Sequence, residues 1–274
     1  MPKLFEFGRA IFAVAMIGMG VQCILRGNVV PQLEPVVGVT SLPVIGWFTG
    51  IVLIAAAVAS MVRRTAISGA TVLAAVVLLW VVLLHAPALA AAPKNGSEWT
   101  GASETFALGG VALVLFGLTR LSLAWRRIPD ALTARCVTIG RILVGVSMLG
   151  FGTLHFLYIP YVAVVIPSWI PAHDGFAYAT GVAHIAAGLS ILTGVLARMA
   201  ALCAAAMFGS WVLILHVPRA LAHVHEANEW MSMLIALAMC GGSLLIAATL
   251  SNISRGAALA NDADASHTRT TAAA

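Results

Sequence analysis

Long apolar stretches, separated by short polar or proline-containing breaks, make up almost the whole chain. A helix that crosses a bilayer needs roughly 20 mainly apolar residues, at a rise of about 1.5 Å each. Eight stretches meet this requirement, and we predict membrane-spanning helices over residues 8–26, 45–62, 66–86, 103–125, 137–158, 174–196, 198–217 and 230–250. The pattern therefore predicts an all-α, polytopic membrane protein with eight transmembrane helices.

Prolines mark several of the breaks between these stretches. Pro87 and Pro218 are expected to end the third and seventh helices, because a proline inside a helix removes a backbone hydrogen bond and clashes with the preceding turn. The break at Arg198 contains no proline, so a tight turn is expected there.

Composition supports the membrane assignment. The chain has 274 residues, of which 61% are hydrophobic and 9% are charged, whereas roughly a quarter of an ordinary soluble domain is charged. The net charge of +5 is spread between apolar runs instead of forming one basic face, so we expect no nucleic-acid partner. The four cysteines form neither a C-x-x-C motif nor a metal-ligand spacing.

The positions of Lys and Arg predict the orientation, because positively charged loops are retained in the cytoplasm. With eight spans, twelve of the fifteen fall on one side: Lys3, Arg9, Arg63, Arg64, Arg120, Arg126, Arg127, Arg135, Arg141, Arg198, Arg255 and Arg269. The other side has Arg26, Lys94 and Arg219. We therefore expect a multi-pass protein with its N- and C-termini in the cytoplasm.

The second half of the chain repeats the first. A shift of 131 or 132 positions aligns residues of types too rare to coincide by composition alone. The matching pairs are Gly8-Arg9 with Gly140-Arg141, Met16 with Met148, Gly18 with Gly150, Gly20 with Gly152, Thr49-Gly50 with Thr180-Gly181, Trp80 with Trp211, His85 with His216, Pro87 with Pro218, and Glu98-Trp99 with Glu229-Trp230. Four spans per unit give both units the same orientation in the membrane.

The repeat predicts two tandem four-helix bundles. The first unit covers residues 1–128 and the second covers residues 129–252. Residues 253–274, rich in Ala, Asp, Ser and Thr, are expected to form a disordered cytoplasmic tail.

Histidines in the second unit supply the main candidate chemistry. His155 shares one helix face with Arg141, Gly145, Met148 and Gly152, because these residues are spaced by three and four positions. His184 shares a face with Thr180, Gly181 and Gly188. Small residues allow close helix approach, so both faces are expected to point into the bundle.

These histidines lead to one predicted polar site. The first unit has Cys23 and Leu53 where the second has His155 and His184, so the site is expected in the second unit. The candidate cofactor-binding residues are His155, His184, Trp211 and His216. No catalytic residue is assigned, and the sequence leaves open whether the protein is an enzyme.

Other polar residues have structural explanations. A histidine in the last turn of a helix, as predicted for His85 and His216, interacts with the negative end of the helix dipole. Glu98 and Glu229 suit helix N-termini for the converse reason. We expect no metal site, since the loop around His223 offers no third fixed ligand.

Several sequence motifs in the second unit resemble those of the DoxX-like family of bacterial membrane proteins. They are Gly152-Thr-Leu-His155-Phe156, Ile166-Pro-Ser-Trp-Ile-Pro171, Tyr178-Ala-Thr-Gly181-Val-Ala-His184 and His216-Val-Pro218. The resemblance implies a four-helix bundle in the bacterial inner membrane, in some members linked to quinone-dependent systems such as thiosulfate:quinone oxidoreductase. The family usually has one such unit, and its members often have glutamate at the position of His184.

Three functions follow as hypotheses. The first is a redox-associated membrane subunit that binds a quinone-like head group, with a soluble oxidoreductase subunit as partner; a haem held by His155 and His184 is a variant of it. The second is a non-catalytic membrane partner or assembly factor. The third is a small-solute transporter, which the parallel repeats suggest and the lack of Asp or Glu in the middle of the predicted spans disfavours.

Overall fold

A computed structural model describes residues 2–27, 43–125 and 127–271, with side chains described as far as residue 250. The described chain is helical and contains no strand. Its helices are α1 (Pro2–Arg26), α2 (Pro43–Met61), α3 (Ala66–Trp80), the π-helix η2 (Val81–His85), α4 (Ala86–Ala91), α5 (Gly96–Ser122), α6 (Asp130–Leu157), α7 (Ile159–Val165), α8 (His173–Thr193), α9 (Ala197–Trp211), the π-helix η3 (Val212–His216), α10 (Val217–Ala222) and α11 (Ala227–Thr271).

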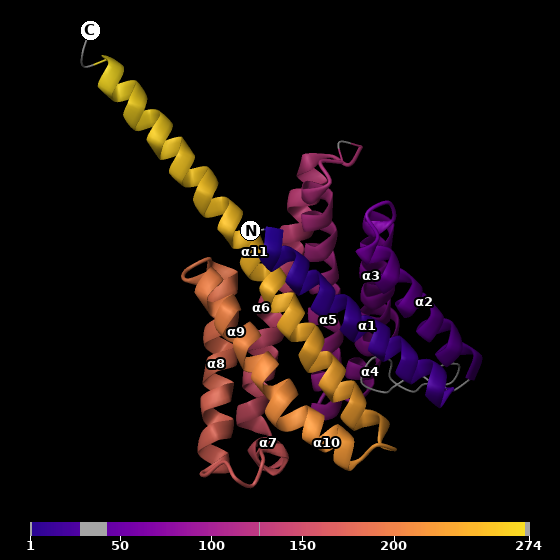
Figure 1. The fold of residues 1–274 in the computed structure, drawn as a ribbon. Coiled ribbons are helices and arrows are strands. Elements are labelled where there is room, and N and C mark those ends of the chain that lie inside the picture. Colours follow the sequence, from indigo (N-terminus) through magenta and orange to yellow (C-terminus); the bar gives the residue numbers. More distant parts are fainter. Residues whose placement is uncertain (1, 28–42, 126, 272–274) are drawn as a thin grey trace.

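All eight predicted spans are confirmed as helices that are long and apolar enough to cross a membrane. Large apolar side chains such as Phe48 and Val164 face outward, as expected for a protein whose solvent is lipid. The ribbon of α11 continues to Thr271 (Figure 1). The disorder and cytoplasmic location of residues 253–274 stay predictions.

The expected helix ends at Pro87 and Pro218 are wrong, because the chain continues as helix to Ala91 and Ala222. The turn before each proline widens to a π-helix. The N–H of Ala86 donates to the carbonyl oxygen of Val81, and the N–H of Val217 donates to the carbonyl oxygen of Val212. A wider turn accommodates a ring that would otherwise clash with the carbonyl four residues earlier. Each π-helix therefore lets one span pass through its proline.

The break near Arg198 is a tight turn, as predicted. Helix α8 ends at Thr193 and is capped by Gly194. The φ of Gly194, +84°, suits a residue without a side chain, and its N–H donates to the carbonyl of Ser190. Leu196 also has a positive φ, of +52°, immediately before α9 begins. Two left-handed residues thus make this turn without a proline.

The fourth span begins at Gly96, seven residues before the predicted start. Asn95 caps this helix, since its side-chain oxygen accepts a hydrogen bond from the N–H of Ser97 at 3.0 Å. The indole N–H of Trp99 donates to the carbonyl oxygen of Pro93. Trp230 is the counterpart of Trp99 in the repeat, and its indole N–H donates to the carbonyl oxygen of Val224. The two fourth helices therefore start in the same way.

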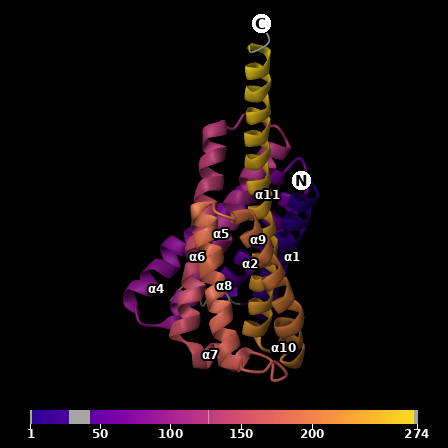
Figure 2. The ribbon, with the colours of Figure 1, turned by 90° about the vertical axis from the view of Figure 1, so that its left-hand side faces the viewer.

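The spans form a closed ring. Each packs against its neighbours in sequence, in the order α1, α2, α3, α5, α6, α8, α9 and α11, and α11 returns to α1. Figures 1 and 2 show α11 between α9 and α1. Helices α5 and α11 also contact each other at the centre. In α5 and α11, 72% of the most apolar stretch is buried inside the protein. In the other six spans this share is at most 44%.

Glycines set the closest helix contacts between the units. A Cβ atom added at Gly140 on α6 would lie 2.4 Å from the carbonyl oxygen of Gly110 on α5. One added at Gly241 on α11 would lie 2.8 Å from that of Gly8 on α1. These two contacts are related by the sequence repeat. The eight spans thus form one ring, in which the fourth helix of each repeat packs against the first helix of the other repeat. The boundary between two units at residue 128 stays a prediction.

Candidate functional site

Glycine contacts also bring α6 and α8 together inside the second unit. A Cβ atom added at Gly152 would lie 2.8 Å from the carbonyl oxygen of Gly181, and one at Gly188 would lie 2.8 Å from that of Gly145. The predicted small-residue faces of His155 and His184 therefore meet. As a result, the two imidazole rings lie with their centroids 4.9 Å apart.

The indole of Trp211, at the end of α9, completes this contact from a third helix. Its centroid lies 5.5 Å from His184 and 6.5 Å from His155, almost parallel to the latter ring at 21°. Phe151 and Phe208 each meet His184 edge to face at 5.7 Å. We call these five residues the ring cluster.

Both imidazoles of the ring cluster are bonded to their own helices. Nδ1 of His155 lies 2.8 Å from the carbonyl oxygen of Phe151, and Nδ1 of His184 lies 2.9 Å from that of Thr180. Among the described residues, neither Nε2 atom has a hydrogen-bond partner. His184 is buried, whereas His155 and Trp211 are half-buried. The ring cluster can therefore be reached through His155 and Trp211.

His216 stands apart from the other three candidates. It ends η3, and within the described residues no ring contact links it to the ring cluster. Its Nδ1 is buried without a hydrogen-bond partner among the described residues. Nearby, Arg219 donates through Nε to Oε2 of Glu229 at 2.9 Å, which joins α10 to the start of α11. The structure thus brings together His155, His184 and Trp211, but not His216.

The first unit has a packed apolar core at the matching place. Cys23, Leu53 and Trp80, the counterparts of His155, His184 and Trp211, are all buried. Met19 and Val77 occupy the positions equivalent to Phe151 and Phe208, and both are fully buried. The imidazole pair is therefore a feature of the second unit, as the sequence predicts, while its cofactor-binding role stays a prediction.

Two polar residues on α5 in the first unit, Glu104 and Thr105, are not among the residues predicted from the sequence. Thr105 Oγ1 and His85 Nε2 are hydrogen-bonded at 3.0 Å, so His85 has a partner inside the protein and lies within its span instead of at the end. Glu104 lies nine residues into the same helix, with its Oε2 buried and unbonded among the described residues. Because α5 begins earlier than predicted, Glu104 lies further inside this span than the predicted start at residue 103 implies. An ionisable residue in an apolar run was the available signal.

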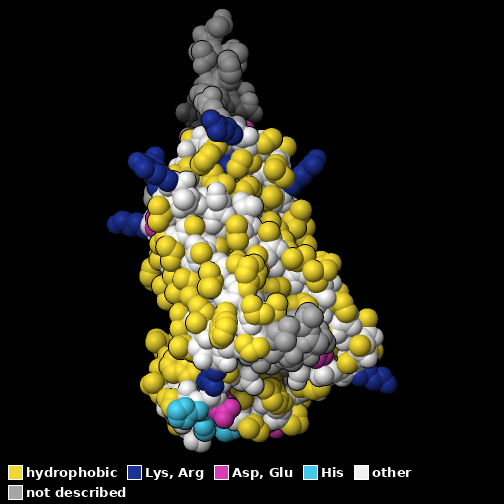
Figure 3. Space-filling model, turned by 90° about the vertical axis from the view of Figure 1, so that its right-hand side faces the viewer, with side chains coloured by type: hydrophobic (Ala, Val, Ile, Leu, Met, Phe, Trp, Pro, Cys, Tyr) yellow, Lys and Arg dark blue, Asp and Glu magenta, His cyan; other side chains and the backbone are white. Residues whose placement is uncertain are grey.

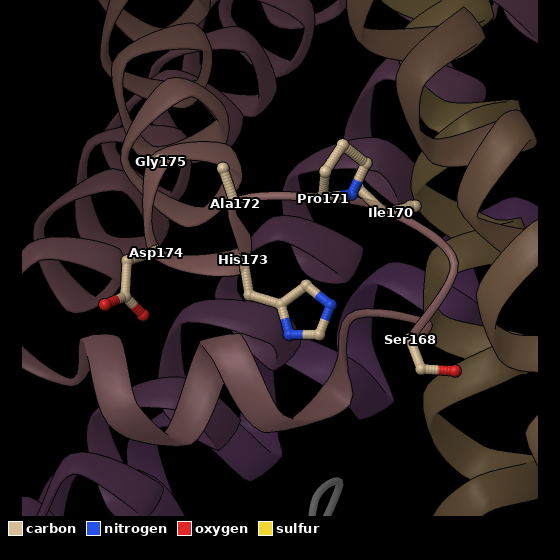
Figure 4. A pocket seen from close by; sticks show the side chains of 7 residues that line it. All are labelled: Ser168, Ile170, Pro171, Ala172, His173, Asp174 and Gly175. Atoms are coloured by element: carbon tan, nitrogen blue, oxygen red, sulfur yellow. The ribbon is translucent and has the colours of Figure 1, made fainter.

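An open pocket lies in the loop between α7 and α8 (Figure 4). It is lined by Ser168, Ile170, Pro171, Ala172, His173, Asp174 and Gly175. In Figure 4 the side chains of His173, Asp174 and Ser168 point in different directions. Because its polar groups do not converge, this pocket offers less specific chemistry than the ring cluster.

Fold and site together define an all-helical, polytopic membrane protein made of two repeated units, with an imidazole pair in the second. Residues 144–251 match a family described as a domain of unknown function (DUF8561). The match begins within α6 and ends within α11, so it covers most of the second unit and less than half of the chain. No curated protein and no solved structure matches the chain.

Proposed function

We propose that the protein is a DoxX-like, redox-associated subunit of the bacterial inner membrane, and that its ring cluster binds the head group of a quinone. The pair formed by His155 and His184 carries this proposal. Each Nδ1 is bonded to its own helix, so the Nε2 atoms of two neighbouring rings are left for a ligand. The sequence phrases shared with the DoxX-like family support the same assignment.

The chemistry of a quinone head group suits these side chains. A quinone is a flat ring with apolar faces and polar edges. Trp211 and Phe208 offer aromatic surfaces to its faces, and the imidazoles offer polar atoms to its edge. The half-buried His155 gives access from the lipid. A bound quinone would supply two-electron, two-proton chemistry, while the protein would bind and orient its ring.

A haem fits the imidazole pair less well. An iron centred between two opposed imidazoles, at about 2 Å from each nitrogen, would hold their centroids about 6 Å apart with the porphyrin between them. The two rings lie 4.9 Å apart and are tilted by 43°. The spacing and tilt of this pair therefore do not fit a haem iron held between the two rings.

We also propose that both termini lie in the cytoplasm. On the face drawn in Figure 3, most of the Lys and Arg side chains lie in the upper part of the view, and histidine side chains gather at its lower end. Positively charged loops favour the cytoplasmic side. His155, two residues from the end of α6, then lies in the outer half of the membrane.

The test is to purify the full chain in mild detergent, extract its lipids and quantify bound quinone. We expect quinone in a fixed ratio to protein, and a loss of more than tenfold in the double variant His155→Ala, His184→Ala. His223→Ala is the matched control, because this histidine is exposed and directly follows α10, outside the ring cluster. An absorbance spectrum of the same sample tests for haem through its Soret band.

Absence of quinone from the wild-type protein, including after incubation with a short-chain quinone, would contradict the proposal. If the protein instead retains a soluble oxidoreductase that remains bound in the double variant, a non-catalytic membrane partner or assembly factor becomes the better description.

One observation favours a second candidate, a small-solute transporter. Glu104 places an acid inside a central span, where ionisable residues often belong to ion or solute pathways. Transport in proteoliposomes that is lost in Glu104→Gln and kept in His155→Ala would support this candidate over the quinone site.

A further inference from the structure

The hydrogen bonds of the two imidazoles fix their protonation pattern. A carbonyl oxygen can only accept a hydrogen bond, so the Nδ1 atoms of His155 and His184 must both donate to the carbonyls of Phe151 and Thr180. A neutral imidazole carries a single N–H. Each Nε2 atom therefore has a lone pair and acts as an acceptor.

The surroundings favour the neutral form of both rings. His184 is in contact with Phe151, Phe208 and Trp211, and a charge in such an apolar, membrane-embedded site is costly. None of the described ion pairs includes either imidazole. The two neighbouring rings thus both carry an acceptor at Nε2, and two acceptors cannot bond to each other without an additional proton.

We infer that the ring cluster is selective for the reduced, hydroxyl-bearing form of its ligand, a hydroquinone, over the oxidised quinone. This inference rests on the proposed function. A hydroquinone has two O–H groups, which donate hydrogen bonds to Nε2 atoms. A quinone has carbonyl oxygens only, so its lone pairs would face those of the imidazoles, and the polar atoms of both partners would stay unbonded at a cost in affinity.

The experiment compares the two redox forms of one short-chain ubiquinone analogue. The full chain is stripped of endogenous quinone, placed in lipid nanodiscs under anaerobic conditions, and titrated with each form by equilibrium dialysis. We expect the quinol to bind at least tenfold more tightly. In His155→Asn and His184→Asn the ratio should fall toward one, because an amide NH₂ can donate to a quinone carbonyl. His223→Asn should keep the wild-type ratio.

Each outcome separates this inference from the proposed function. Equal affinity for the two forms, or preference for the quinone, would overturn the selectivity and leave the quinone site in place. Binding of neither form would overturn both. A second measurement addresses folding failures in the variants: ¹⁵N NMR of histidine-labelled wild-type protein should show protonated Nδ1 and unprotonated Nε2 at both rings, and the opposite pattern would also overturn the inference.

Discussion

At the level of His155, the second unit has a cluster of imidazole and aromatic rings where the first unit has a packed apolar core. The backbone around the two places is similar. Gly20 and Gly50 make the close contact in the first unit that Gly152 and Gly181 make in the second. The same glycine framework therefore forms around either set of side chains.

This comparison shows that the fold does not require the ring cluster. Leu53 is fully buried in the position where the second unit buries His184, and both helices pack through glycine. A buried imidazole loses its interactions with water, whereas a leucine does not. Packing alone therefore does not explain the histidines of the second unit.

The largest effect is expected from the glycine contacts between the units, which both halves share. Gly140→Leu would drive a side chain into the carbonyl of Gly110, and Gly8→Leu would do the same at Gly241. Overpacking costs about 1–3 kcal/mol where side chains can move, and more is expected against a backbone. We expect both variants to elute as aggregates in detergent size-exclusion chromatography.

Gly175→Ala is the control for these variants, because its new Cβ atom would lie 3.8 Å from the nearest atom. It should elute and melt like the wild type. A monodisperse Gly140→Leu protein with an unchanged Tm would contradict the packing of α5 against α6.

Exchanging the equivalent core residues Leu53 and His184 should change the Tm in opposite directions in the two units. Leu53→His places an unpaired polar ring in an apolar core, which we expect to cost about 2–3 kcal/mol and to lower the Tm by about 5–10 °C. His184→Leu removes a buried polar group and should raise the Tm by about 2–4 °C. Thermal unfolding in detergent measures both. A large decrease in Tm for His184→Leu would show that the imidazole pair itself holds the helices together.

Hydropathy and the repeat predict the spans and their duplication from sequence, because span length and rare residues at one shift are local signals. The meeting of His155 with His184 is also predictable, since small residues on both faces permit close approach. The contact of α5 with α6 is not, because Gly110 resembles many other glycines in apolar helices. Composition does not specify which of them meet.

The π-helices explain the errors at Pro87 and Pro218. Proline at positions 87 and 218 predicts a helix end when only the α-helical turn is considered. A local widening of the turn removes the clash and leaves no trace in the hydrophobic pattern. The spans therefore continue, and His85 and His216 lie within them instead of at their ends.

The smallest expected effect concerns these repeated histidines. In the first unit His85 is bonded to Thr105, whereas the position of Thr105 is occupied in the second unit by Ala236. Hydrogen bonds between transmembrane helices are worth about 0.6–2 kcal/mol. Thr105→Val keeps the side-chain shape and removes the hydroxyl, so we expect the Tm to fall by about 1–5 °C.

Thr105→Ser is the matched control, because it keeps the hydroxyl and should recover most of the lost Tm. In the second unit, Ala236→Ser would offer His216 the partner that its counterpart already has, and we expect a gain of about 1–2 °C. If Thr105→Val melts like the wild type while Thr105→Ser is destabilised, the methyl group and not the hydroxyl stabilises this contact, and the two units differ there in packing alone.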